Sequence, residues 1–277
     1  MALPVGPFSI YRLLRELRGI SADPRPLGVG GARELAGALA RELTRGGDPA
    51  AVREVGTDPG GVRGVVALVY VLAGKPQEED ELVLKAASKA GMPIVCLVVG
   101  GERLEVPYAL AEDVIPLGAG EGFPVEEIAE ALGKRLDEQA APLAARLPVL
   151  RRGVAKAWIA KVSKQNAVLS AAIFVPGADM AVLTLNQVRL VVRLAAAWGR
   201  EIDQKLMPEI LAVVASGFGF RAIARSLIGA VPILGWAVQG GVALVATRAL
   251  GEATVRYLEE TSGRGRAEPR AAGSDRP

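Results

Sequence analysis

Two long apolar runs, separated by one helical pattern, most constrain the fold of this 277-residue chain. The runs are GVVALVYVL at 64–72 and MPIVCLVV at 92–99, and neither contains a charged residue. Continuous apolar runs of this kind are typical of parallel strands that are buried on both faces of a sheet. The segment between them, EEDELVLKAASKAG at 78–91, predicts a helix with acidic residues in its first turn and glycine at its end.

The same alternation of strand and helix extends over residues 23–138. A weak strand is expected in PLGVG at 26–30, followed by an alanine- and leucine-rich helix at 31–46. DVIPLG at 113–118 predicts a shorter strand, and a proline opens a helix at 124–136. This order predicts a three-layer α/β domain with a mostly parallel sheet.

After about residue 139 the strand-like alternation does not return. We expect a proline-broken linker at 139–148 and then an all-helical domain at 149–260. Its long helical segments are expected at 149–172, 182–202, 205–228 and 233–260. Residues 1–22 predict an amphipathic helix, docked on the protein in preference to a membrane surface, and the small, polar residues 261–277 predict a disordered tail.

The residue types that the chain lacks exclude several kinds of catalytic and metal site. It has no histidine and one cysteine, Cys96, which lies in the apolar run at 92–99. A disulfide framework, a Cys/His zinc site, a Cys–His dyad and a Ser–His–Asp triad are therefore excluded, and we predict no catalytic and no metal-binding residue. Near the N-terminus, Arg12, Arg15 and Arg18 follow the apolar residues, so we expect no signal peptide and a cytoplasmic location.

The stretch PLGVGGARELAGALA at 26–40 has the outline of a phosphate-binding loop without its chemistry. A Walker A loop requires glycine, four residues and then Gly-Lys-Ser/Thr, and no such sequence follows Gly28, Gly30 or Gly31. In the dinucleotide fingerprint, Arg33 occupies the position of the third glycine, which allows close helix packing. We therefore interpret these glycines as a degenerate loop and expect no cofactor.

The last elements of the α/β part run from a buried strand, followed by GGER, to a Gly-x-Gly turn at Gly120–Gly122 and the helix VEEIAEAL at Val125–Leu132. In this layout residues 23–138 resemble the back half of an Era-like GTPase. The Asn-Lys-x-Asp that selects guanine in that family is missing, since GGER stands in its place. DPGG at 58–61 fits a loose D-x-x-G pattern, but such a sequence is usually a turn. The resemblance implies a degenerate G domain.

Three motifs mark the helical half: PGAD at Pro176–Asp179, VPILGW at Val231–Trp236 and TRALGEA at Thr247–Ala253. With these motifs, about 150–260 is similar to the YcjF-like family, domain of unknown function 697. The resemblance implies a domain that often follows an Era-like GTPase and occurs in several membrane proteins. It implies no catalytic activity.

The most apolar segment leaves two interpretations open. No charge occurs in the 22 residues between Arg225 and Arg248, which is long enough to span a bilayer, but Pro232 and Gly235 interrupt it. The segment therefore predicts either a buried core of a soluble bundle or a hairpin inserted in a membrane. Small residues at spacings of four would let helices approach closely and would suit self-association. These are Ala243, Thr247 and Gly251.

A basic segment precedes the first long apolar stretch at 165–178. Between Lys134 and Lys164 there are eight Lys/Arg and two Asp/Glu, which gives a net charge of +6 against +3 for the whole chain. Such a segment is typical of the cytoplasmic side of a membrane with anionic lipid, and otherwise of a solvated helix face. Within this segment Trp158 is the one aromatic residue available for base stacking, so we expect no nucleic-acid partner. The candidate membrane- or partner-binding residues are Arg151, Arg152, Lys156, Lys161, Lys164 and Trp236, together with Ala243, Thr247 and Gly251.

The sequence thus favours a non-catalytic adaptor with a pseudo-GTPase domain, associated with the inner face of the cell membrane. Its expected partners are an anionic membrane surface and a GTPase or other protein, with self-association left open. The alternative is a soluble partner-binding protein that acts with a separate GTPase. An active NTP-hydrolysing enzyme is the third and least favoured interpretation.

Overall fold

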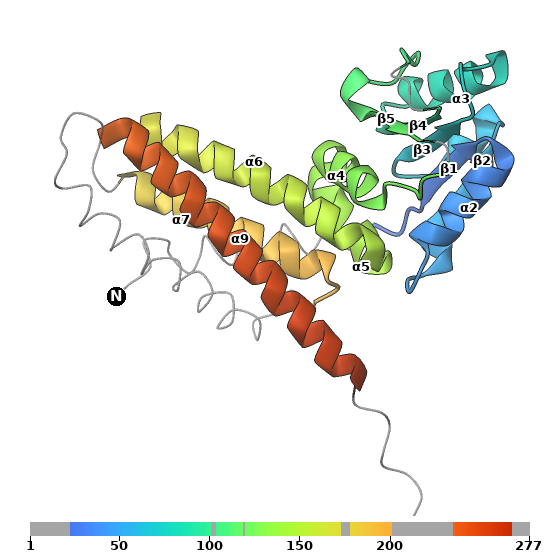
Figure 1. The fold of residues 1–277 in the computed structure, drawn as a ribbon. Coiled ribbons are helices and arrows are strands. Elements are labelled where there is room, and N and C mark those ends of the chain that lie inside the picture. The colour runs from blue at the N-terminus through green and yellow to red at the C-terminus, as the bar shows by residue number, and fades with distance from the viewer. Residues whose placement is uncertain (1–22, 101–103, 119, 173–177, 201–234, 268–277) are drawn as a thin grey trace, which may run out of the picture.

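The computed structural model describes residues 23–100, 104–118, 120–172, 178–200 and 235–267. Figure 1 shows an α/β part from which long helices extend. The amphipathic helix expected at 1–22 and the helical segment expected at 205–228 lie outside the described residues.

The sheet has five parallel strands in the order β2-β1-β3-β4-β5. They are β1 (Leu27–Gly31), β2 (Val52–Gly56), β3 (Leu68–Leu72), β4 (Ile94–Val99) and β5 (Val114–Leu117). The strands expected in the apolar runs and in the two shorter segments are all present, and every pairing is parallel. The predicted parallel sheet is confirmed.

β2 is the strand that the sequence pattern does not indicate. Its sequence, VREVG, has one buried side chain, Val55, while Arg53 and Glu54 are exposed. The strand lies at the edge of the sheet and pairs only with β1, with Val52 opposite Leu27. An edge strand does not need the continuous apolar run that marks a strand buried on both faces.

Different helices cover the two faces of the sheet. α2 (Arg33–Leu43) and α4 (Val125–Leu136) lie on one face, and α3 (Glu78–Lys89) lies on the other. Successive side chains of β3 alternate between these layers, so that Val69 packs with the first group and Tyr70 with α3. The three-layer α/β arrangement follows from this alternation.

Residues 139–148, expected to be a linker, instead form a packed part of the structure. They contain α5 (Ala140–Arg146), most of whose side chains are buried. Pro142 stands in the first turn of this helix, where its missing N–H breaks no hydrogen bond within the helix. The guanidinium of Arg146 donates to the carboxylate of Asp48 at 3.0 Å and so ties α5 to the α/β part.

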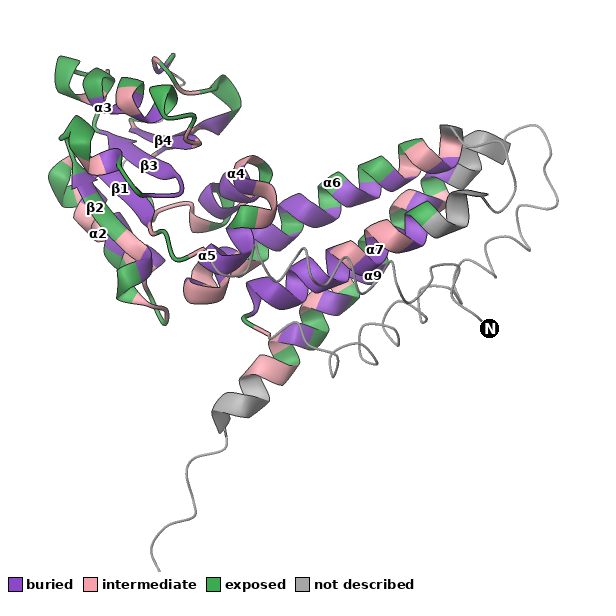
Figure 2. Ribbon diagram, turned by 180° about the vertical axis from the view of Figure 1, so that it is seen from behind, coloured by how far each residue is buried: buried purple, intermediate pink, exposed green. Residues whose placement is uncertain are grey.

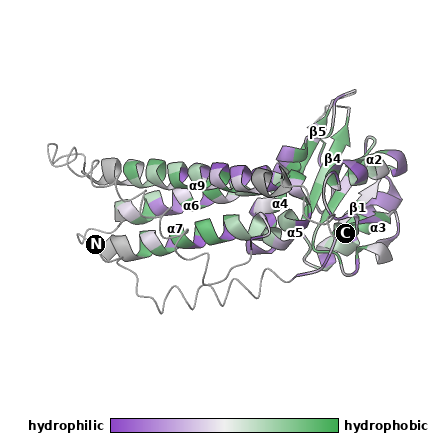
Figure 3. Cartoon of the chain, turned by 90° about the horizontal axis from the view of Figure 1, so that it is seen from below, coloured by the Kyte–Doolittle hydropathy of each residue, from purple (hydrophilic) through white to green (hydrophobic). Residues whose placement is uncertain are grey.

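Three long helices form the rest of the described chain. α6 (Arg151–Ala172) and α7 (Ala178–Ala197) correspond to the expected segments, and α9 (Gly235–Ala267) to the last one. α9 continues through 261–267, which we expected to belong to the disordered tail, and 268–277 lie outside the described residues. The helices lie side by side and point away from the sheet (Figure 3).

Two glycines join the α/β part to the helices. A Cβ on Gly153 of α6 would lie 2.4 Å from the carbonyl oxygen of Glu126 and 2.5 Å from the Cβ of Ala129. A Cβ on Gly133 of α4 would lie 2.9 Å from the Cα of Val154. Only glycines allow α4 and α6 to cross at this distance.

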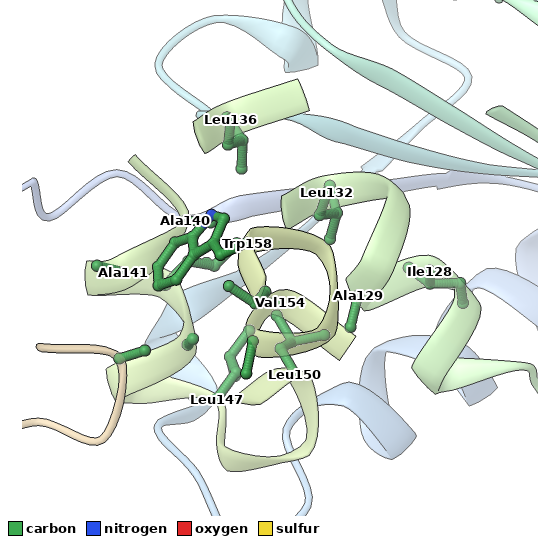
Figure 4. Close-up of a cluster of buried hydrophobic side chains, with 14 of the residues drawn as sticks. Ile128, Ala129, Leu132, Leu136, Ala140, Ala141, Leu147, Leu150, Val154 and Trp158 are labelled. Atoms are coloured by element: carbon green, nitrogen blue, oxygen red, sulfur yellow. The ribbon is translucent and has the colours of Figure 1, made fainter. Parts of the chain in front are cut away.

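This crossing makes one apolar core out of two parts of the chain. Buried side chains continue from the sheet through α4 and α5 into the helices (Figure 2). At the junction the fully buried Trp158 lies among side chains of α4 and α5, including Leu132, Leu136, Ala140 and Ala141 (Figure 4). The α/β part and the helices therefore share a core.

We predict that the G153A substitution destabilises the protein by roughly 1–3 kcal/mol, because the added methyl group forces α6 away from α4. Chemical denaturation of the full chain measures this free energy of unfolding. The control is G241A in α9, where a Cβ would have no atom within 4 Å. It should instead stabilise the protein by up to about 1 kcal/mol through helix propensity. Equal effects of the two substitutions would contradict the account of the crossing.

Candidate functional site

The carboxyl end of β1 is where the strand order reverses, which is the usual ligand site of an open parallel sheet. Here a single residue, Ala32, joins β1 to α2. Its N–H donates to the carbonyl of Val71 at 2.8 Å, and a Cβ on Gly31 would lie 2.0 Å from the same oxygen. The connection therefore lies directly against β3.

The other two glycines of the degenerate loop lie inside β1. A Cβ on Gly30 would lie 2.8 Å from the carbonyl oxygen of Gly56, and one on Gly28 would lie 3.1 Å from side-chain atoms of Val55 and Val65. Both glycines thus allow close packing around the strand. Their backbone groups are part of the sheet, where a phosphate would need them free in a loop.

The remaining polar candidates in the α/β part have local structural roles. The Asp58 carboxylate of DPGG accepts a hydrogen bond from the N–H of Gly60 at 2.9 Å, as expected for a turn. In the first turn of α3, the Asp80 carboxylate accepts hydrogen bonds from the N–H of Gln77 and the hydroxyl of Tyr70. Within the described ranges, no group of three or more Cys, Asp or Glu residues is arranged to hold a metal ion.

Most of the candidate cations of the basic segment have partners on neighbouring parts of the chain. The Arg152 guanidinium binds Glu259 of α9 at 2.7 Å. Lys156 contacts Glu130 of α4 at 3.0 Å and Glu126 at 3.4 Å, and Lys161 contacts Asp137 at 2.9 Å. Arg151 donates to the carbonyls of Ala144 and Ala145 and lies over the ring of Trp198. Lys164 is exposed, and no carboxylate of the described residues pairs with it.

A groove of about 680 Å³ runs between α4, α6 and α9. Its apolar lining includes Ala155, Ile159 and Leu244, and its rim carries both signs of charge. The five cations of the rim are Arg152, Lys156, Lys164, Arg248 and Arg256, and its four anions are Glu126, Glu130, Glu252 and Glu259. Because these charges nearly balance, the groove does not select a strongly charged ligand.

Farther from the sheet, polar side chains share the interior of the bundle with apolar ones. We call the distal end of the bundle residues 165–172 of α6, 178–188 of α7 and 235–247 of α9. Here the Asn166 amide donates to the Thr247 hydroxyl at 3.0 Å, and Gln187 donates to the same oxygen at 3.2 Å. The Asn186 amide donates to the Asn166 carbonyl oxygen at 2.9 Å. These four residues form a polar layer that joins all three helices.

The outside of the distal end is apolar. Val168 of α6 is 68% exposed, Val182 of α7 is 42% exposed and Val245 of α9 is 63% exposed. By contrast, Asn166 and Thr247 are fully buried, Asn186 is half-buried and Gln165 is exposed. Apolar side chains are buried in the distal end as well, namely Leu183, Val188 and Ala243. Valines this exposed around a buried polar layer depart from the usual pattern of helices in water.

The stripe of small residues packs within the chain. Gly240 and Gly251 face α6, where their Cβ atoms would lie 3.1 Å from the Ala167 carbonyl oxygen and 2.6 Å from the Ile159 side chain. Ala243 is buried between them, as is Thr247 of the polar layer. The stripe therefore brings α9 close to α6, and the side chain of Trp236 lies outside the described ones.

Sequence reasoning did not identify the polar layer. The layer requires knowledge of how α6, α7 and α9 align. None of the helices in the described ranges combines the length and the hydropathy that crossing a bilayer requires. No protein-family model matches the chain, and no curated protein matches its sequence.

The Glu130 carboxylate of α4 contacts Lys156 of α6, and this contact between the two helices depends on pH. Hydrogen bonds from Lys134 and then Lys156 hold the pKa of Glu130 below its ordinary value of 4.5. A carboxyl group with a lowered pKa stabilises the fold above its ordinary pKa, and this contribution is lost as the pH falls.

We predict that E130Q lowers the free energy of unfolding at pH 7 by up to about 1 kcal/mol and that the difference is smaller at pH 3. Denaturation curves at the two pH values measure the effect. The matched control is E127Q, at an exposed position of the same helix, which should change stability at neither pH. A loss that is equal at both pH values would contradict the ionic origin of the link.

Proposed function

We propose that this chain is a non-catalytic, membrane-associated interaction protein that contacts anionic lipid through the distal end of its bundle. The exposed valines around a buried polar layer at that end carry the proposal. A lipid environment favours outward valines, inward amides and hydroxyls, and small residues where helices cross, and all three features occur here. The resemblance of this half to the YcjF-like family agrees with the proposal.

Charge at the edge of the distal end supports an anionic lipid surface. Lys164 of α6 and Arg248 of α9 are exposed there, close to the polar layer. A basic residue near an anionic leaflet contributes about 1 kcal/mol of attraction. The attraction falls with salt, because the surface potential is screened within a Debye length.

The α/β part would act in this protein as a degenerate G-like domain that offers a surface to protein partners. The one-residue connection at Ala32 supports the absence of nucleotide, since no loop is left to surround a phosphate. All five strands of the sheet are parallel, and this agrees with a G domain of which only the parallel strands remain.

A soluble protein that binds a separate GTPase is the second candidate. The groove between α4, α6 and α9 favours it, because an apolar floor with a rim of both charges suits an amphipathic helix of a partner. In this case the chain would bind its partner without lipid.

We predict that V168E and V245E each weaken binding to vesicles of phosphatidylglycerol and phosphatidylcholine by at least about tenfold, because a charge is costly in the apolar region. Both positions are exposed, so the substitutions should preserve the fold. The control is L82E on α3, where the leucine is 50% exposed but belongs to the α/β part. Co-sedimentation at low and high salt measures binding. No binding by the unmodified chain would reject the membrane proposal and favour the soluble candidate.

We also predict that the purified chain shows no measurable binding of Mg-GTP or Mg-ATP at millimolar nucleotide. The physical reason is the missing loop and the missing lysine of the Walker A pattern. Isothermal titration calorimetry measures binding directly, and saturable binding would revive the enzyme interpretation.

A further inference from the structure

Apart from Asp179 near the start of α7, the charged residues of the bundle stop at one level. Beyond the polar layer toward the sheet, the first charges are Lys164 on α6, Arg189 on α7 and Arg248 on α9. Each lies within three positions of a residue of the polar layer, so the three cations share a level across the bundle.

Helix directions confirm that this level is the same on all three helices. α6 runs away from the sheet, whereas α7 and α9 run toward it (Figure 1). Lys164 therefore precedes Asn166 on the sheet side, while Arg189 and Arg248 follow Asn186 and Thr247 on that side. Because a helix rises about 1.5 Å per residue, the backbones of these three cationic residues lie within roughly 5 Å of the polar layer along the helix axes.

The part beyond these cations, in which Asp179 is the one charged residue, has a defined depth. From the polar layer, α6 extends by six residues to Ala172, α7 by eight to Ala178 and α9 by twelve to Gly235. These lengths correspond to roughly 9, 12 and 18 Å of helix. One leaflet contributes about 15 Å, half of the hydrocarbon core of a bilayer.

We propose that the distal end inserts into one leaflet as far as the level of Lys164, Arg189 and Arg248, with these cations at the headgroups. The inference rests on the proposed function and adds depth and orientation to it. A long basic side chain at this level keeps its charge in the interface while its stem lies along apolar surface. The α/β part then projects away from the membrane.

The positions of the exposed valines favour lipid over a protein partner. Val168, Val182 and Val245 lie on three different helices of the bundle, so the exposed apolar surface is not confined to one helix. A protein partner covers one face of such a bundle, whereas lipid surrounds it. Burying a valine side chain in hydrocarbon stabilises the inserted state by up to about 1.5–3 kcal/mol.

Depth-dependent fluorescence tests this boundary in the full chain. V168C and V245C place a thiol in the part that is proposed to insert. A160C and A253C place a thiol at exposed positions on the sheet side of the boundary, on α6 and α9. Each variant is labelled with an environment-sensitive fluorophore and mixed with phosphatidylglycerol/phosphatidylcholine vesicles that carry nitroxide acyl chains. The native Cys96 is buried, and burial raises the pKa of its thiol to about 12, so it should stay unlabelled in the folded protein.

We expect at least about twofold quenching and a blue shift at 168 and 245, with neither at 160 or 253. Quenching at all four positions would overturn the boundary, since the bundle would then insert past its cations. Quenching at none, with the protein still bound to vesicles, would overturn insertion and leave the membrane proposal standing. Failure of the unlabelled chain to bind vesicles would overturn both.

Discussion

The close crossing of α4 and α6 at Gly133 and Gly153 determines how the two halves of this protein are arranged. Without side chains at these positions, the backbones approach until Cβ atoms would overlap the facing helix. The crossing places Trp158 in a core that is continuous with one face of the sheet. It also sets the direction in which α6 leaves the α/β part, and α7 and α9 pack on α6. The orientation of the whole bundle therefore depends on this contact.

Along the bundle the physical basis of packing changes. Near the sheet the interior is mainly apolar, with Ser163 and Thr254 also buried, and ion pairs such as Arg152–Glu259 connect the outer surfaces of the helices. Such exposed pairs contribute little to stability but satisfy the charges of a basic segment. Beyond Lys164 a polar layer crosses an interior that also holds apolar side chains, and valines are exposed on all three helices. A change of this kind within one set of helices is understandable if the two parts face different solvents.

The sequence predicts the elements that a continuous pattern marks. β3 and β4 are apparent as apolar runs, and α3 is apparent from its acidic first turn and terminal glycine. The edge strand β2 is not apparent in the sequence, because Val55 is the one side chain of this strand that is buried. The sequence did not indicate α5, because Pro142 suggests the end of a helix. In the structure this proline lies in the first turn of α5, where it is tolerated.

The candidate site was harder to predict, because it depends on which helices meet. The basic residues between 134 and 164 were visible in the sequence, but their pairing with carboxylates of α4 and α9 was not. Asn166 and Thr247 are 81 positions apart, and only the antiparallel packing of α6 and α9 brings them together. The combination of a buried polar layer with the exposed Val168 and Val245 follows from this alignment.

Hydrogen–deuterium exchange of the full chain, with and without anionic vesicles, tests membrane association through the distal end most directly. The account predicts slower exchange on vesicle addition in 165–172, 178–188 and 240–247, with unchanged exchange in the strands of the sheet. Slower exchange confined to the α/β part, or none in the distal end of vesicle-bound protein, would contradict it.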